Sequence, residues 1–215
     1  MHLVKFKATV ASATLAIAIF GASIASAATV SYNQFVTGDD LGGGTQATLT
    51  YVQNGNDVDF SLTNLLNSLA TSFISSIGFT YTGNAPTSVA NLTGSQANVT
   101  GLGADNSLIV PGKGLSIDFA ALFTTNNSGG GANRLVVGET ALFRILNAQA
   151  SLFDFSPFKT GIRGQGLAGD GSTKYTSGDN DGGTGLSPVP VPAGLPMLLS
   201  AVLGMAYLRK RKLKA

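Results

Sequence analysis

The chain has 215 residues, among them 28 glycines and a single histidine, and it contains neither cysteine nor tryptophan. Without cysteine it has no disulfide framework, no thiolate nucleophile and no thiolate metal site. The histidine is His2, inside an expected leader, so the remaining chain also lacks a Ser-His-Asp triad, an imidazole zinc site and a histidine haem ligand.

The formal net charge of +2 hides an uneven distribution of charge along the chain. Residues 28–187 carry six of the 13 basic side chains but all 11 acidic ones, a balance of about −5. Binding to nucleic acid requires the opposite, a basic surface that neutralises phosphates. We therefore expect no nucleic-acid partner for this part of the chain.

Residues 1–27 have the layout of a signal peptide. Lys5 and Lys7 supply the positive start, residues 8–24 form an apolar run, and Ala25 and Ala27 frame an A-x-A cleavage pattern. The sequence thus predicts a leader helix that is cleaved after Ala27 during export. The alternative is an uncleaved N-terminal membrane helix.

The next residues alternate with period two, the pattern of β-strands. Residues 28–36 predict a first strand, and residues 45–51 a second, with Ala47, Leu49 and Tyr51 on one face. Asn54 and Gly55 then favour a tight turn, since both residues tolerate positive φ. In residues 57–63 the apolar side chains again alternate with polar ones, which predicts a β-hairpin.

Further strands are expected at residues 72–81, 115–121, 135–137, 141–146 and 152–155. In the first of these, Phe73, Ile77, Phe79 and Tyr81 are expected to share one face. Strands of this spacing predict a mainly β domain over residues 28–168, an antiparallel β-sandwich of jelly-roll-like form. A solenoid is the alternative, although no clean internal repeat is visible.

The composition changes near residue 161, because nine of the 25 residues from 161 to 185 are glycine. Residues 169–188 therefore predict a flexible linker. Behind it lies an apolar stretch over residues 193–208. As a helix this stretch is about 24 Å long, against roughly 30 Å for a bilayer core.

A basic cluster follows the apolar stretch and favours a cytoplasmic end. Its first four residues are Arg209, Lys210, Arg211 and Lys212. The physical pattern indicates a short transmembrane helix with a basic stop signal, which snorkelling side chains help to place. A C-terminal helix buried in the domain is the alternative.

The tail at residues 189–215 resembles a PEP-CTERM sorting signal, and most closely its VPLPA variant. The resemblance rests on a proline-rich box, an apolar helix and a basic end, combined with a signal peptide. The box consists of Val189, Pro190, Val191, Pro192 and Ala193. Val191 stands where the name-giving motif has glutamate.

This resemblance implies a processing partner and an address. The partner is an exosortase-type enzyme that removes the tail, which leaves the protein only transiently anchored in the inner membrane. The address is the cell surface or extracellular matrix of a Gram-negative bacterium that makes exopolysaccharide. The same kind of tail has also been named after ice-binding proteins.

Three motifs of catalysis lack the context that their chemistry needs. Residues 164–169 match G-x-G-x-x-G, but no helix is predicted after them. Ser156 and Lys159 match S-x-x-K, yet the same Lys159 would have to serve a K-T-G motif as well. Glu139 is the lone glutamate, whereas a glycosidase needs two carboxylates. We expect no enzyme; a hydrolase that uses aspartates alone is the alternative.

Two features are candidates for binding. Asp39-Asp40 and Asp179 with Asp181 offer oxygen ligands to Ca²⁺, although no cofactor is expected. Thr48 with Thr50, and Thr80 with Thr82, line outward strand faces. The sequence therefore predicts a non-enzymatic surface or matrix protein associated with exopolysaccharide or biofilm. The alternative is a displayed carbohydrate- or ice-binding module.

Overall fold

The computed structural model describes residues 27–104, 108, 115–126, 133–168 and 171–178. These residues form strands and a single 3₁₀ turn, and every strand pairing is antiparallel. The elements are β1 (Ala28–Gly38), β2 (Ala47–Asn54), β3 (Asp57–Asn64), β4 (Phe73–Tyr81), β5 (Val89–Asn91), β6 (Val99–Gly103), β7 (Phe119–Phe123), β8 (Leu135–Val136), β9 (Thr140–Ile145), η1 (Ala150–Leu152), β10 (Phe153–Asp154), β11 (Thr160–Gln165) and β12 (Ser172–Ser177). The prediction of a mainly β, antiparallel domain is confirmed.

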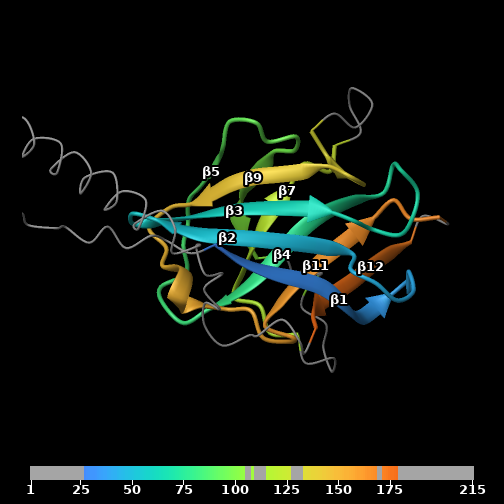
Figure 1. Ribbon diagram of the computed structural model, residues 1–215, viewed down its shortest axis with the longest axis horizontal. Helices are drawn as coiled ribbons and strands as arrows, with labels where there is room; N and C mark the ends of the chain where they lie inside the picture. The colour runs from blue at the N-terminus through green and yellow to red at the C-terminus, as the bar shows by residue number, and fades with distance from the viewer. Residues whose placement is uncertain (1–26, 105–107, 109–114, 127–132, 169–170, 179–215) are drawn as a thin grey trace, which may run out of the picture.

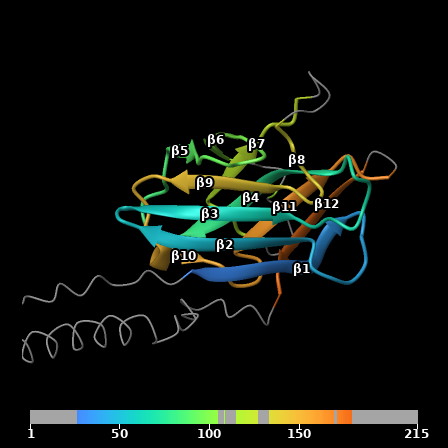
Figure 2. The same cartoon turned by 45° about the horizontal axis from the view of Figure 1, so that its top comes forward.

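The strands make one 12-stranded sheet that curls into a nearly closed barrel. The path runs β5-β9-β3-β2-β1-β12-β11-β4-β7-β6, with β8 and β10 paired to β4 beside it. Figures 1 and 2 show β9, β3, β2 and β1 as one layer and β4, β11, β12 and β7 as the layer behind it. The two ends of the path meet where the side chain of Asn91 bonds both backbone groups of Val99.

An aromatic core fills the space between the two layers. Phe60, only 2% exposed, lies with its ring centroid 5.2 to 5.4 Å from those of Phe79, Phe143 and Phe153. Burying each such ring removes apolar surface from water, worth roughly 1.5–3 kcal/mol, and the ring pairs add about 0.5–1.5 kcal/mol each. Packing of this kind replaces the disulfides that the chain does not have.

The β2–β3 hairpin matches the alternation predicted from the sequence. Val58, Phe60 and Leu62 are buried, and the residues between them are half-exposed. The turn lies one residue later than expected, because Asn54 still pairs with Asp57 and the loop consists of Gly55 and Asn56. Only Gly55 has a positive φ, +62°, which is the position where a type II′ turn requires glycine.

One expected strand face is wrong in detail, because β4 contains a β-bulge. Along β11, Arg163 pairs with Ser76 and the next residue, Gly164, pairs with Ile74, so Ser75 is the extra residue of β4. The bulge reverses the alternation. Ile74 therefore joins Ile77, Phe79 and Tyr81 in the core, while Phe73 packs under the guanidinium of Arg134, 4.3 Å from the ring centroid.

The predicted linker at residues 169–188 is also wrong where the structure describes it. Residues Ser172–Ser177 form β12, which lies in the middle of the sheet between β1 and β11. Tyr175 is 1% exposed and anchors this strand in the core. The folded body therefore extends past residue 168 to at least Ser177.

The leader and the sorting tail lie outside the described residues, apart from Ala27. Ala27 is exposed and directly precedes β1. Within the described ranges the structure contains no helix with the length and hydropathy of a membrane span.

Candidate functional site

Four neighbouring strands present an array of hydroxyl side chains on the outer surface of the sheet. Residues between them in sequence, such as Val30, Leu49 and Leu62, are buried in the core, so the hydroxyls point the other way. We call this array the hydroxyl face; it consists of Thr29, Ser31, Thr48, Thr50, Ser61, Thr63 and Thr140.

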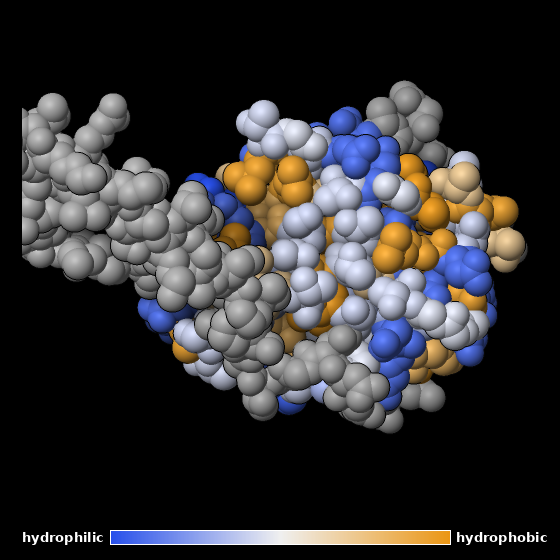
Figure 3. All heavy atoms as spheres, viewed as in Figure 1, coloured by the Kyte–Doolittle hydropathy of each residue, from blue (hydrophilic) through white to orange (hydrophobic). Residues whose placement is uncertain are grey.

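The strand register aligns these hydroxyls into two rows. One row runs Ser31, Thr48, Thr63, Thr140, and the other runs Thr29, Thr50, Ser61. Neighbouring strands lie about 4.8 Å apart, and residues two apart on one strand are about 6.7 Å apart. The rows thus form a regular two-dimensional grid. Figure 3 shows side chains of intermediate hydropathy gathered on this side of the molecule.

Hydrogen bonds hold parts of the grid and leave other parts available. The hydroxyls of Thr29 and Thr50 are 3.2 Å apart, and those of Thr63 and Thr140 are 2.9 Å apart. Within the described chain the hydroxyls of Thr48 and Ser61 make no hydrogen bond, and both residues are partly exposed. A hydroxyl both donates and accepts, so the grid can bond a ligand that also does both.

An ion pair borders the hydroxyl face on the strands β3 and β9. Nη2 of Arg144 donates to Oδ2 of Asp59 at 2.9 Å, and Nδ2 of Asn54 donates to the same oxygen at 2.8 Å. The hydrogen bond from Arg144 is the main reason why the pKa of Asp59 is held below its ordinary value. Both charges of the pair are therefore satisfied within the sheet, and the hydroxyl face itself is neutral.

The sequence predicted only part of this face. Thr48 and Thr50 belong to it, whereas Thr80 lies near the end of β4, in the other layer, and Thr82 directly follows that strand. Their hydroxyls donate to the carbonyls of Ser116 and Leu152. The sequence does not indicate the other five residues of the face as part of a binding surface, because only the strand register makes them neighbours; they are Thr29, Ser31, Ser61, Thr63 and Thr140.

The structure gives local roles to the residues of the catalytic motifs. Ser156 donates from both its backbone and its hydroxyl to Asp154. Gly164 lies inside β11, where an added Cβ would meet Thr173 and Leu66 at 2.9 and 3.0 Å. The next described element is the strand β12, so the dinucleotide-binding context of strand, loop and helix is missing.

The acidic residues considered for Ca²⁺ binding and for glycosidase chemistry also make local hydrogen bonds, in the part of the chain that the structure describes. Oδ1 of Asp40 accepts hydrogen bonds from the Tyr175 hydroxyl and from the Gly42 amide, both at 3.0 Å. Burial raises the pKa of Tyr175, which keeps the phenol protonated as a donor. Glu139 accepts from the Val136 amide. In the described ranges no three carboxylate or imidazole groups converge.

The remaining candidates lie outside the described residues. They are Asp179 and Asp181 of the calcium interpretation, Ala25 of the cleavage pattern, the box at residues 189–193 and the basic stop at residues 209–212.

Comparisons with known proteins gave no match to this chain. No protein-family model, no curated protein sequence and no solved structure matches it.

Proposed function

We propose that this protein is an exported, non-enzymatic component of the cell surface or extracellular matrix, and that its hydroxyl face binds extracellular polysaccharide. The observation that carries the proposal is the grid of seven hydroxyls in two aligned rows. Polysaccharides are extended and repeat their hydroxyls, so a neutral, regular grid matches them better than it matches a small or charged ligand.

The polar surface of this face supports a reversible interaction with a hydrated polymer. Side chains of serine and threonine are short, and the β-branched threonine is also stiff at χ1, so little conformational entropy is lost when they bond a ligand. Each single contact is weak, but a repeating polymer engages many of them, and the linked contacts add in affinity. The proposed binding requires no cofactor.

The address of the protein is part of the same proposal. It rests on the signal-peptide pattern at residues 1–27 and on the resemblance of residues 189–215 to a sorting tail. We propose an exosortase-type enzyme as processing partner and a transient membrane anchor in a Gram-negative host. The first and last described strands, β1 and β12, are antiparallel neighbours, so the chain enters and leaves the body side by side.

We also propose that the folded body is a β-sandwich and, more narrowly, a jelly-roll-like one. The two layers around one aromatic core support it. A face on the outside of one layer remains free of the core, which is the arrangement that display of a binding surface requires.

The test is retention of the protein on exopolysaccharide purified from its native host. The double variant Thr48→Val, Ser61→Ala removes two hydroxyls and keeps the strand propensity of Thr48. We expect retention to fall roughly tenfold, because two hydrogen bonds of about 0.7 kcal/mol each, together about 1.4 kcal/mol, are lost. A separate measurement tests the proposed address. Mass spectrometry of the protein recovered from the matrix fraction identifies the two ends that processing leaves.

Thr87→Val is the matched control, since Thr87 is exposed in the loop between β4 and β5, away from the hydroxyl face. Equal retention of the double variant and this control would refute polysaccharide binding by the hydroxyl face. Loss of ice-recrystallisation inhibition, with polysaccharide retention unchanged, would favour ice as the ligand instead. Recovery of the full-length chain from the cytosol would refute the proposed address.

A further inference from the structure

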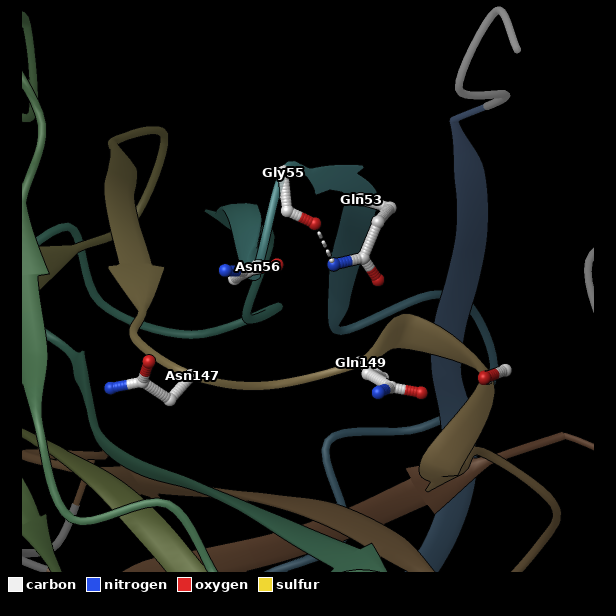
Figure 4. Close-up of a pocket in the computed structure, with 6 residues that line it drawn as sticks. Gln53, Gly55, Asn56, Asn147 and Gln149 are labelled. Carbon is white, nitrogen blue, oxygen red and sulfur yellow. Dashed lines mark hydrogen bonds between the residues drawn. The ribbon is translucent and has the colours of Figure 1, made fainter.

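A second polar site lies at one end of the sheet, next to the β2–β3 turn. It is an open pocket of about 480 Å³, a volume within the range of small-molecule sites. Its lining contains no charged side chain and consists of Gln53, Gly55, Asn56, Asn147, Gln149 and Ser151. Figure 4 shows Gln53 and Asn56 on one side and Asn147 and Gln149, on the segment after β9, on the other.

Gln53 fixes the two sides of this pocket relative to each other. Its Nε2 donates to the carbonyls of Gly55 at 3.0 Å and of Ala148 at 3.1 Å, so one amide group joins both loops. Its Oε1 accepts from the amide of Ala150 at 2.7 Å. With these bonds the Gln53 side chain is a structural element of the pocket wall rather than a group available to a ligand.

Backbone hydrogen bonds fix the segment after β9 as well. The Asn147 amide donates to Oδ1 of Asp57 at 2.9 Å, and the Gln149 amide donates to the Tyr81 hydroxyl at 3.1 Å. Asn147 has φ +53°, a left-handed conformation that asparagine tolerates better than most residues. The pocket wall is therefore organised before any ligand arrives, which lowers the entropic cost of binding.

The side chains that the wall presents have their hydrogen-bonding groups available. Asn56, Asn147, Gln149 and Ser151 are exposed, and in the described part of the chain their side chains make no hydrogen bond. Three amides and one hydroxyl offer donors and acceptors side by side. A ligand with vicinal hydroxyls needs donors and acceptors arranged in this way, because each of its hydroxyls donates one hydrogen bond and accepts others.

The charge around the pocket selects among such ligands. The carboxylate of Asp57 lies behind the wall, bonded to the Asn147 amide, and residues 28–187 carry an excess of acidic groups. An anionic sugar would meet like charge there, and a neutral one would not. From this geometry we infer that the pocket binds one or two units of a neutral saccharide. The inference extends the proposed polysaccharide binding to a second, separate site.

Saturation-transfer NMR on the purified full-length protein tests this inference, with cellobiose, maltose and lactose as neutral probes and glucuronic acid as the anionic one. We expect a signal from at least one neutral disaccharide and a weaker one from glucuronic acid. The double variant Asn147→Gly, Gln149→Ala should weaken binding of that disaccharide by roughly tenfold, because two amide contacts are lost. Glycine at position 147 keeps the left-handed backbone accessible.

Asn84→Ala is the matched control, because Asn84 is an exposed asparagine in the turn after β4, outside the pocket. A melting temperature of the double variant equal to that of the control shows that the fold is intact. No signal from any neutral disaccharide, or an unchanged affinity in the double variant, would overturn the inference. The retention assay on exopolysaccharide separates this inference from the proposed function. If only the hydroxyl-face variant loses retention and the pocket variant keeps it, the proposed function holds and the pocket plays no part in binding the polymer.

Discussion

At the scale of single residues, a few buried hydroxyls join strands that the sequence keeps far apart. Oγ1 of Thr160 lies 2.8 Å from the Tyr32 hydroxyl and donates to the Gly78 carbonyl at 2.9 Å, so β1, β11 and β4 meet at one side chain. Thr160 is fully buried. No pattern in the sequence singles it out, because its partners are 128 and 82 positions away.

We predict that Thr160→Val destabilises the protein by about 1–3 kcal/mol, because the buried Gly78 carbonyl loses its donor while the side-chain volume is nearly kept. Urea unfolding followed by circular dichroism measures the change. Thr82→Val serves as control, since Thr82 also bonds a carbonyl but is exposed to solvent. A stability change in the Thr160 variant no larger than in this control would contradict the prediction.

At the scale of elements, the sequence predicts strands well where large apolar residues alternate and poorly where they do not. The β2–β3 hairpin has three apolar residues on the core face of each strand, and the turn is misplaced by one residue only. The strand β12 has the sequence STKYTS, in which Tyr175 is the one large ring, and glycines surround it. Its place in the sheet comes from pairing with β1 and β11, and no local pattern encodes those partners.

The central position of β12 makes a direct prediction about truncation. A chain that ends at Asp170 should fail to fold, because removing β12 leaves the long strand β1 and the strand β11 as unpaired edges and opens the barrel. A chain that ends at Gly178 should fold. Resistance to limited proteolysis distinguishes the two, and a protease-resistant body in the shorter chain would show that β12 is dispensable.

The same difference between local sequence pattern and strand pairing determines which parts of the candidate sites are predictable. The sequence predicts Thr48 and Thr50 as outward hydroxyls, since alternation places them opposite buried residues. It does not predict the complete hydroxyl face, which depends on the register of four strands. The polar pocket next to the β2–β3 turn is not predictable either, because its walls, residues 53–56 and 147–151, are brought together by the pairing of β3 with β9 and by the hydrogen bonds of Gln53.

At the scale of the whole molecule, the side chain of Asn91 joins the two strands at the ends of the sheet, β5 and β6. The Asn91 Nδ2 donates to the Val99 carbonyl at 3.0 Å, and its Oδ1 accepts from the Val99 amide at 2.8 Å. Asn91 thus takes the place of a backbone pairing between β5 and β6, which end the strand path. Without this seam the barrel would present two open edges, the usual starting points of aggregation.

We predict that Asn91→Ala opens this seam locally and leaves the rest of the sheet intact. Both backbone groups of Val99 lose their partner, so the amide of Val99 should exchange with deuterium roughly tenfold faster, the effect of about 1–1.5 kcal/mol in local opening. Amides in the β2–β3 hairpin serve as the internal reference, because the hairpin lies on the far side of β9 from the seam. Asn91→Asp keeps an acceptor for the Val99 amide and removes the donor to its carbonyl, so it should show a smaller effect. Equal acceleration at the seam and in the hairpin would mean that Asn91 supports the fold as a whole, and no acceleration at Val99 would mean that the barrel is closed by other contacts.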